Sequence, residues 1–482
     1  MTNLVDLLPD PNDHIVIEVI DLNHGKVRLN RKVLKPIFSG DGVCFQVKAF
    51  IQGKNKLVEK CFVNRANGSF GLGSLNRVRN HLRSKGFKTR TYDPHGFLDV
   101  DDLFEDEHIM LGSGVSEFDH QKKILRLAKK HGRGQFVAAT GSGKSFGQYL
   151  IAKNVKGNTL VLCHSIDIVN QLYKGSLPYF DKDDCVRMDS SWDREGKVCF
   201  CVNKSALLIP RKKIFDYFDC IIVDEAHRFS SEYEEFFEYM AAPLRFSFTA
   251  TPPEDDRKIS LEKFFGDILL KLDTQWGIDK GILTPPTVVV VKGQFVFGLN
   301  DQKYQQIYKG AVTQNIMFNR DVAKVIDFCV KTSKSFLCMV ISLEHGENIA
   351  RIVQREFGHD IPFMHGKSTK SDRENVQAII RDRTLPGAIC TNIWEAGIDI
   401  QNLDCAIIAF NGKVDQGVAR VPQFLGRALR KADGKDKAYV FDFTAKNKYL
   451  AEHFVSRLEM YLEEGWDMTT FDALCKEFKY KK

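Results

Sequence analysis

The sequence lacks the apolar runs that a membrane protein needs. No stretch approaches the roughly 18 consecutive apolar residues that span a bilayer. The amino-terminal segment, MTNLVDLLPDPND, has early acids and no apolar core of signal-peptide length. We therefore expect a soluble, cytoplasmic protein that has no membrane partner.

Cysteine spacings typical of metal sites are also missing. None of the 12 cysteines forms a C-x-x-C pair, the usual mark of zinc sites and redox motifs. Several of them, among them Cys163, Cys220 and Cys390, lie within apolar runs, where a free thiol behaves as a small hydrophobic side chain. We expect free thiols in a reducing compartment and no structural metal.

Neither sign of charge dominates the whole chain. Lys and Arg number 69 against 62 Asp and Glu, and the resulting net charge of +7 says little about partners. The distribution is less even, because residues 54–90 contain ten basic residues and one acid, while residues 91–107 carry seven acids. A polyanion-binding surface explains the basic block, and so does a solvated charged face.

Residues 1–105 are expected to form a small α/β domain. Alternating segments such as HIVIEVI predict strands, and the run after Gly73 predicts a helix that begins at Ser74 and ends near Gly86. Arg79 and Arg83 are four residues apart and share an exposed face of this helix. We expect this domain to bind the polyanionic partner.

Two further domains are predicted by the short apolar runs that follow, over residues 106–285 and 286–482. Runs such as TLVLC, CIIV and CAIIAF do not alternate with polar residues, as is typical of strands buried on both faces of a parallel sheet. We therefore predict an α/β fold with two tandem parallel-sheet lobes. Ligands of such sheets bind at the carboxyl ends of the strands.

The run AATGSGKS, residues 138–145, lies between the strand-like QFV and a helical stretch, as a phosphate-binding loop requires. Its glycines let backbone N–H groups turn toward phosphate oxygens. Lys144 would reach the β- and γ-phosphates of ATP, and the Ser145 hydroxyl would coordinate Mg²⁺. Ala138 replaces the first glycine of the general pattern. The candidate ATP contacts are Thr140, Gly141, Ser142, Gly143, Lys144 and Ser145.

A second motif, CIIVDEAH, ends an apolar strand with two acids. Asp224 would hold the Mg²⁺ through water, and Glu225 would accept a proton from the attacking water. Acids that only cap the following helix are the alternative. The phosphate loop 80 residues upstream, between Lys144 and Asp224, favours the catalytic interpretation.

These motifs and two later ones, TATP at residues 249–252 and QFLGRALR at residues 423–430, resemble the ordered series of superfamily 2 helicases. The resemblance implies two RecA-like lobes that bind ATP and Mg²⁺ between them. It places Phe118 and Gln121 at the adenine, where a glutamine can bond N6 and N7. It gives catalytic roles to Lys144, Asp224, Glu225, Gln423, Arg427 and Arg430, and cofactor contacts to Gly397 and Asp399.

The same resemblance implies which residues touch nucleic acid. In the first lobe they are His164, Ser165, Gln171, Asn203 and Lys204, and in the second His365, Gly366 and Thr391. The basic helix of the amino-terminal domain adds Arg77, Arg79 and Arg83, whose guanidinium groups suit phosphate contacts.

Details of the motifs point to the DNA-directed branch, which includes RecG-like, XPB-like and phage UvsW-type helicases. TATP replaces SAT, the last motif lacks the second glycine of the RNA-directed class, and the run FGLG, residues 70–73, precedes the basic helix. The resemblance implies a monomeric, ATP-dependent DNA helicase or translocase that unwinds or branch-migrates forks and junctions and also binds single strands.

Three alternatives stay open from sequence. An RNA helicase would use the same backbone-contacting motifs, and a translocase could follow duplex DNA without separating strands. A scaffold with an inactive ATPase is disfavoured, because Lys144, Glu225 and Arg430 are all present.

Overall fold

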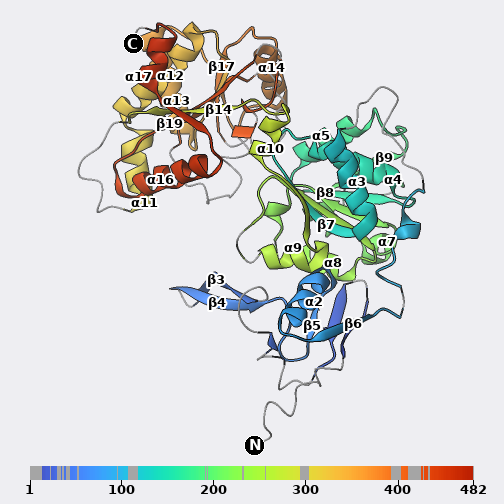
Figure 1. The fold of residues 1–482 in the computed structure, drawn as a ribbon. Helices are drawn as coiled ribbons and strands as arrows, with labels where there is room; N and C mark the ends of the chain where they lie inside the picture. The colour runs from blue at the N-terminus through green and yellow to red at the C-terminus, as the bar shows by residue number, and fades with distance from the viewer. Residues whose placement is uncertain are drawn as a thin grey trace, which may run out of the picture. The chain divides into compact units, whose positions relative to one another are not determined.

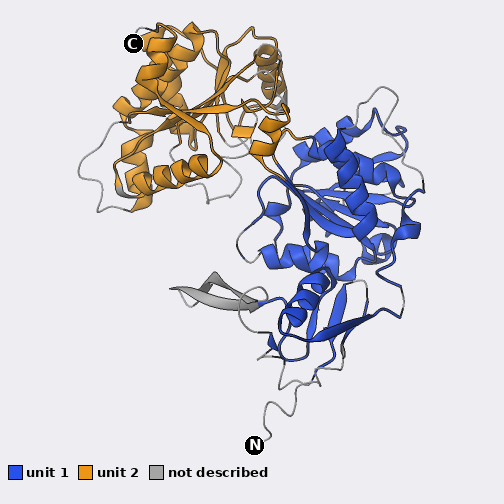
Figure 2. Ribbon diagram, in the orientation of Figure 1, with its two compact units in different colours: residues 1–138, 143–271 blue, residues 139–142, 272–482 orange. Residues whose placement is uncertain are grey.

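The computed structural model describes most of the chain as two compact units (Figures 1 and 2). Unit 1 is residues 1–138 with 143–271, and unit 2 is residues 139–142 with 272–482. Within the described residues no helix is long and apolar enough to cross a membrane. The described residues are 14–21, 23–29, 34, 37–38, 44–51, 54–94, 96–106, 118–189, 191–192, 194–230, 233–253, 255, 257–293, 303–391, 403–410, 425–426, 428–432 and 435–480.

The amino-terminal part of unit 1 is a small α/β domain, as the sequence predicts. A four-stranded mixed sheet in the order β5-β2-β1-β6 packs against α2, and a separate hairpin, β3-β4, extends from it. Helix α2 begins after Ser74, and Gly86 adopts a φ of +88° just beyond the helix end. The elements are β1 (His14–Val19), β2 (His24–Val27), β3 (Cys44–Ile51), β4 (Lys54–Cys61), β5 (Ser69–Gly71), η2 (Leu72–Ser74), α2 (Leu75–Ser84) and β6 (Lys88–Tyr92).

The rest of unit 1 is a seven-stranded parallel sheet in the order β13-β7-β12-β11-β8-β10-β9, flanked by helices. Its strands are β7 (Arg133–Ala138), β8 (Thr159–Cys163), β9 (Cys185–Met188), β10 (Val198–Val202), β11 (Cys220–Val223), β12 (Leu244–Thr249) and β13 (Ile268–Leu272). The main helices are α3 (Asp119–His131), α4 (Lys144–Asn154), α5 (Ile166–Ser176), α8 (Glu234–Tyr239) and α9 (Arg257–Phe265).

Unit 2 contains a second seven-stranded parallel sheet, in the order β16-β17-β15-β18-β19-β14-β20. Its strands are β14 (Pro286–Val291), β15 (Phe336–Met339), β16 (Phe363–Met364), β17 (Gly387–Cys390), β18 (Cys405–Ile408), β19 (Ala438–Phe443) and β20 (Asp467–Thr470). The helices are α10 (Thr274–Asp279), α11 (Tyr304–Tyr308), α12 (Ile316–Lys331), α13 (Leu343–Ile352), α14 (Lys370–Arg381), α16 (Lys448–Glu463) and α17 (Phe471–Glu477).

Both faces of each sheet are covered, which explains why central strands such as β11 and β15 are apolar and buried along their whole length. In β15, Phe336 and Cys338 belong to one buried cluster, whereas Leu337 and Met339 belong to the cluster on the opposite face. The predicted fold of two RecA-like parallel-sheet lobes with a small amino-terminal α/β domain is thereby confirmed.

One expectation about cysteine is wrong. Ten described cysteines are free thiols, but Cys61 is disulfide-bonded. The antiparallel register of the β3-β4 hairpin pairs Cys44 with Cys61. Residues directly opposite each other in such a ladder have Cβ atoms only about 5 Å apart, and cysteine spacing along the chain gives no sign of this.

The amino-terminal domain docks on helices α8 and α9 of the same unit. Glycines make the close approach possible, because a Cβ at Gly73 would lie 2.2 Å from the Glu262 carbonyl oxygen. Around them, Asn23 donates to the Glu238 carbonyl oxygen at 2.6 Å, and His24 Nε2 lies 2.7 Å from the Glu238 carboxylate. The FGLG run of residues 70–73 therefore supplies part of a domain interface.

Candidate functional site

The phosphate loop follows β7 and leads directly into α4. Gly141 and Gly143 have φ values of +89° and +84°, a region that favours glycine, and α4 begins at Lys144. The Lys144 ammonium donates to the Ala138 carbonyl oxygen at 3.0 Å, and the Ser142 hydroxyl donates to a carbonyl oxygen of the same loop at 2.7 Å. The loop thus has the curled backbone and helix start that bind phosphate.

Gln121, the predicted adenine-contacting residue, lies beside this loop. Its side-chain oxygen accepts a hydrogen bond from the Phe118 backbone N–H at 3.0 Å. A Cβ at Gly143 would lie 2.7 Å from the Gln121 amide nitrogen, so only glycine leaves room for this arrangement. The Gln121 side chain therefore lies against the phosphate loop. The Phe118 ring is instead about half exposed and stacks on His120.

The two acids of the second motif stand at the carboxyl end of β11. Gln148 on α4 donates to Asp224 Oδ1 at 2.7 Å, which ties the acid to the helix that follows the phosphate loop. Burial and the neighbouring Glu225 carboxylate raise the pKa of Asp224 to about 7. Burial acts to raise the pKa of Glu225 as well, but His227 and Lys144 outweigh it and lower this pKa to about 2. Glu225 is therefore ionised at neutral pH, as a proton acceptor must be.

A chain of polar contacts joins this acid to the TATP motif. His227 Nδ1 lies 3.3 Å from Glu225 Oε2 and 3.1 Å from Thr249 Oγ1. The Thr249 hydroxyl donates to the Thr251 carbonyl oxygen at 3.0 Å. Glu225 itself has a φ of +50°, which is uncommon for a residue with a side chain and is typical of strained functional positions. Only the structure shows this link between His227 and Thr249, which are 22 residues apart in the chain.

These groups fit Mg²⁺ and a nucleotide triphosphate. Ser145 and Asp224 offer the oxygen ligands that Mg²⁺ prefers, and Lys144 supplies the charge for phosphate oxygens. The glycines supply N–H groups that no side chain covers. The site thus combines a loop shaped for phosphate, a carboxylate that could hold a metal ion and a second carboxylate that could accept a proton. Hydrolysis of a phosphoanhydride requires groups of these kinds.

In unit 2, side chains and backbone from outside residues 428–430 hold the carbonyl oxygens of Ala428, Leu429 and Arg430. The buried ammonium of Lys435 donates to the carbonyl oxygens of Ala428 and, at 2.9 Å, Arg430. Thr284 donates its backbone N–H to Leu429 at 2.7 Å. Sequence reasoning missed Lys435, although a lysine five residues after the last arginine was visible. The predicted residues Gln423, Arg427, Gly397 and Asp399 lie outside the described residues.

The candidate nucleic-acid residues of the first lobe follow β8 and β10, two neighbouring strands. Ser165 caps α5 by accepting from the Ile168 N–H, and burial lowers the pKa of His164 to about 4. Gln171 and Lys204 are exposed, while Asn203 is buried. Gln171 and Lys204 are therefore accessible to a ligand.

The candidates of the second lobe also share one sheet edge. Thr391 follows β17, and its N–H donates to the Met364 carbonyl oxygen at the end of β16, one residue before His365. Gly366 is exposed beside them. The structure thus brings His365, Gly366 and Thr391 together, as the resemblance implies.

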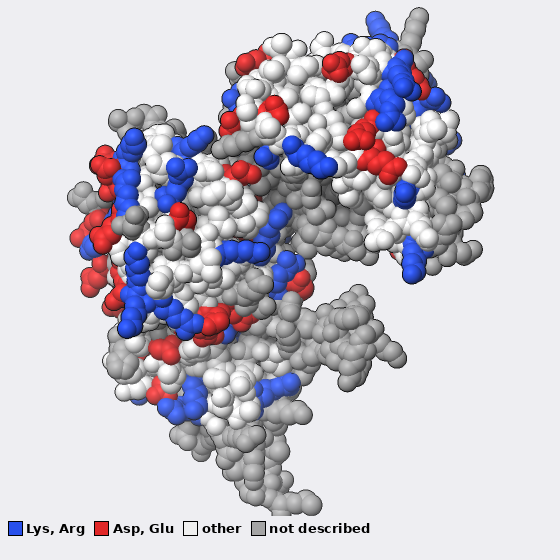
Figure 3. All heavy atoms as spheres, turned by 180° about the vertical axis from the view of Figure 1, so that it is seen from behind, with Lys and Arg blue, Asp and Glu red and all other residues white. Residues whose placement is uncertain are grey.

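The three arginines of α2 have different surroundings. Arg77 forms a two-pronged ion pair with the buried Glu262 carboxylate and lies over the Phe62 ring, so it holds the domain interface rather than facing solvent. Arg79 donates to Asn76, and Arg83 to Thr89. Figure 3 shows basic and acidic side chains interspersed over the drawn face. We therefore withdraw Arg77 from the phosphate contacts and keep Arg79 and Arg83.

Comparison with known proteins agrees with this geometry. Residues 113–254 match the family described as "Type III restriction enzyme, res subunit", and residues 310–432 match "Helicase conserved C-terminal domain". The chain is 24% identical over 354 residues to the putative DNA 3'-5' helicase Rad25 of Halobacterium salinarum, covering 70% of this chain and 56% of the relative. The chain thus spans little more than half of that relative's length.

A solved structure of a restriction-enzyme fragment shares the fold. A fragment of a putative HsdR subunit of a type I restriction enzyme from Vibrio vulnificus covers 87% of this chain and 76% of its own, with a TM-score of 0.57 and 17% identity. T4 UvsW covers 95% of this chain and 99% of its own, with a TM-score of 0.44 and 15% identity.

Proposed function

Because the chain belongs to the superfamily 2 helicases and is an ATP-dependent enzyme of that class, we propose that it drives the unwinding or branch migration of forked and junction DNA. The observation that carries the proposal is the convergence of Lys144, Asp224 and Glu225 at the carboxyl edge of one sheet, linked through His227 to Thr249.

In the proposed hydrolysis, the phosphate loop and Lys144 orient the triphosphate. Ser145 and Asp224 would hold a magnesium ion, which would supply positive charge for the phosphate oxygens. Glu225 accepts a proton from the attacking water. We propose that Arg427 and Arg430 stabilise the charge that develops on the γ-phosphate. Gln121 contacts the adenine, and Gly397 and Asp399 contact the nucleotide from the second lobe.

We propose that the coupling of ATP hydrolysis to DNA movement uses the contacts that connect Glu225, after β11, to Thr249 at the end of β12. Loss of the γ-phosphate changes the charge beside Glu225, and the path through His227 to Thr249 transmits that change to the end of β12. The backbone of the DNA strand is bound at one sheet edge of each lobe. These edges carry Gln171 and Lys204 in the first lobe and His365 and Thr391 in the second. Arg79 and Arg83 contact duplex arms.

DNA rather than RNA is proposed as the substrate because the relative from Halobacterium is named a DNA helicase. Its name also suggests movement in the 3'-to-5' direction. An RNA helicase and a duplex translocase that leaves strands paired are the two alternatives, and we further propose that the protein acts as a monomer in the cytoplasm.

The decisive test is the rate of ATP hydrolysis with no nucleic acid, single-stranded DNA, duplex, fork, four-way junction and matched RNA. We expect branched DNA to stimulate most, and Glu225→Gln to lower the stimulated rate by about 10²- to 10⁴-fold while ATP still binds. Lys144→Ala should weaken ATP binding itself. Stimulation by RNA alone would move the substrate to RNA, and stimulation by duplex without strand separation would favour the translocase.

A further inference from the structure

The two large sheets have the same strand order. Numbered along the chain within each unit, both read 7-1-6-5-2-4-3, so that β14 corresponds to β7, β19 to β12 and β20 to β13. The position that follows β14 in unit 2 is thus the counterpart of the phosphate loop that follows β7 in unit 1. Ligands of such sheets bind where strands end at their carboxyl edge.

The sequence keeps a trace of this correspondence. The same three residues occur near the carboxyl ends of both strands: Phe248-Thr249-Ala250, in which Thr249 is the last residue of β12, and Phe443-Thr444-Ala445, in which Phe443 is the last residue of β19. Thr249 belongs to the nucleotide site of unit 1. In unit 2, the Thr444 hydroxyl accepts a hydrogen bond at 3.0 Å from the backbone N–H of Gly293, just after β14.

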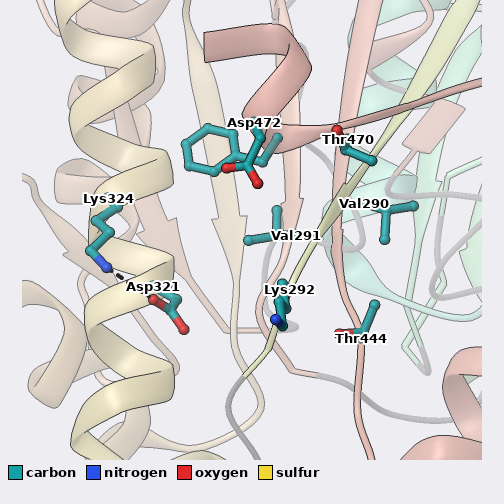
Figure 4. Close-up of a pocket in the computed structure, with 9 residues that line it drawn as sticks. Val290, Val291, Lys292, Asp321, Lys324, Thr444, Thr470 and Asp472 are labelled. Carbon is teal, nitrogen blue, oxygen red and sulfur yellow. Dashed lines mark hydrogen bonds and ion pairs between the residues drawn. The ribbon is translucent and has the colours of Figure 1, made fainter. Parts of the chain in front are cut away.

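A pocket of about 280 Å³ lies at this place in unit 2 (Figure 4). Figure 4 shows Asp321 and Lys324 on one side, both on α12, with Thr470 and Asp472 above and Lys292 and Thr444 below. Val290, Val291 and Phe471 complete the wall. The volume lies just below the lower limit of roughly 300 Å³ for small-molecule pockets, so the ligand can be no larger than about one nucleotide.

In the deep part of the pocket, one carboxylate oxygen of Asp321 can accept a hydrogen bond from a ligand. Asp321 is 7% exposed, and its Oδ1 accepts from Lys324 at 3.2 Å, but its buried Oδ2 has no hydrogen-bond partner. A buried carboxylate oxygen left unpaired costs free energy that a ligand N–H would recover. Val291 and Phe471, both almost fully buried, provide apolar contact beside it.

The mouth of the pocket offers donors. Lys292 is exposed at the end of β14, and Thr470 is exposed at the start of α17. The hydroxyl groups of Thr444 and Thr470 each accept a backbone N–H and still have a proton to donate. Lysine and hydroxyl donors together suit an anionic group such as a phosphate.

We propose that this pocket binds one nucleotide unit, with the base inside, its N–H donor on Asp321, and its phosphate at Lys292. The nucleotide is either a free nucleoside monophosphate or one nucleotide of a DNA strand. The proposal stands on the pocket itself and does not require that the protein unwinds branched DNA, because binding is measured without hydrolysis.

The test uses the full-length chain with Lys144→Ala, which weakens the nucleotide site of unit 1. Affinity for each free deoxynucleoside monophosphate is measured by calorimetry, and affinity for a short single-stranded oligonucleotide by anisotropy. Two further variants, Lys292→Glu at the exposed mouth and Asp321→Asn in the deep part, are compared with Lys476→Ala, an exposed lysine on α17 outside the pocket.

A monophosphate affinity that falls about tenfold in both pocket variants, but not in Lys476→Ala, supports a free nucleotide as the ligand. If no monophosphate binds and the oligonucleotide affinity falls in the same two variants, the ligand is a nucleotide of the strand. Unchanged affinity for both probes in Lys292→Glu, whose exposed position leaves folding intact, overturns the proposal.

Discussion

At the scale of single residues, the nucleotide site depends on side chains whose partners come from distant parts of the sequence. Asp224 is held by Gln148, and His227 lies between Glu225 and Thr249. The opposite pKa shifts of Asp224 and Glu225 follow from this arrangement, because only Glu225 has both His227 and Lys144 beside it to offset burial. The two carboxyl groups therefore differ in acidity although they are neighbours in the chain.

Thr249→Val tests the link between the acid and the end of β12. The change removes the hydroxyl that contacts His227 and keeps the shape of the side chain. We expect ATP hydrolysis to stay within about tenfold of the original rate, since Glu225 and Lys144 are untouched, whereas strand separation per ATP falls more steeply. Parallel measurement of both rates checks this. Equal losses in both, or none, would show that this hydroxyl does not carry the coupling.

At the scale of elements, residues 428–430 are held by hydrogen bonds from groups outside this segment. Lys435 donates to the carbonyl oxygens of Ala428, Arg430 and, at 2.5 Å, Leu403. Burial lowers the pKa of Lys435 to about 8, and the three acceptors need its ammonium form. An ammonium at the end of a helical segment also offsets the negative end of the helix dipole.

Lys435→Met keeps the length and apolar stem of this side chain but removes its donors. We expect kcat for ATP to fall about tenfold or more with KM changed little, because Arg430 would lose its orientation while the phosphate loop stays intact. Lys435→Arg should recover part of the rate if donors matter, and Lys437→Met, an exposed neighbour, is the control. A rise in KM alone would argue against a positioning role.

At the scale of the whole molecule, unit 1 joins the amino-terminal domain to the first lobe through ionisable groups. His24 faces Glu238 and Asp21, and Lys263 also contacts Glu238. The hydrogen bond to Glu238 raises the pKa of His24, and the one from His24 lowers the pKa of Glu238 to about 2. Because the side chains of His24 and Glu238 are partly exposed, their ion pair stabilises the docking of the domain only modestly.

The docking of this domain should therefore depend on pH. The contribution of His24 is fully present below its unfolded pKa of about 6.5 and is lost as pH rises through the raised value. That of Glu238 is present above about 4.5 and is lost as pH falls toward 2. We expect the protection factors of amides at the contact of β2 with α8, which are corrected for the intrinsic pH dependence of exchange, to be highest between about pH 4.5 and 6.5. His24→Gln should abolish the alkaline change; an unchanged profile would contradict this assignment.

The sequence by itself determined the class of fold and the positions of the nucleotide motifs. Apolar runs without alternation require sheets covered on both faces, and a glycine loop between a strand and a helix has few uses other than phosphate binding. These signals are local, so they are readable in a few consecutive residues such as 138–145. The family resemblance rests on the order of such segments.

Only the tertiary structure decided which distant side chains meet. The sequence predicts that Arg77 contacts phosphate, but in the structure it pairs with Glu262. The sequence predicts that Cys61 is a free thiol, but the structure places it in a hairpin register opposite Cys44 and gives it a disulfide bond. From the sequence, Lys435 is expected at the surface, but in the structure its ammonium donates to three carbonyl oxygens. In each case the partner comes from an element whose position depends on packing, and packing is a property of the whole unit rather than of a local pattern.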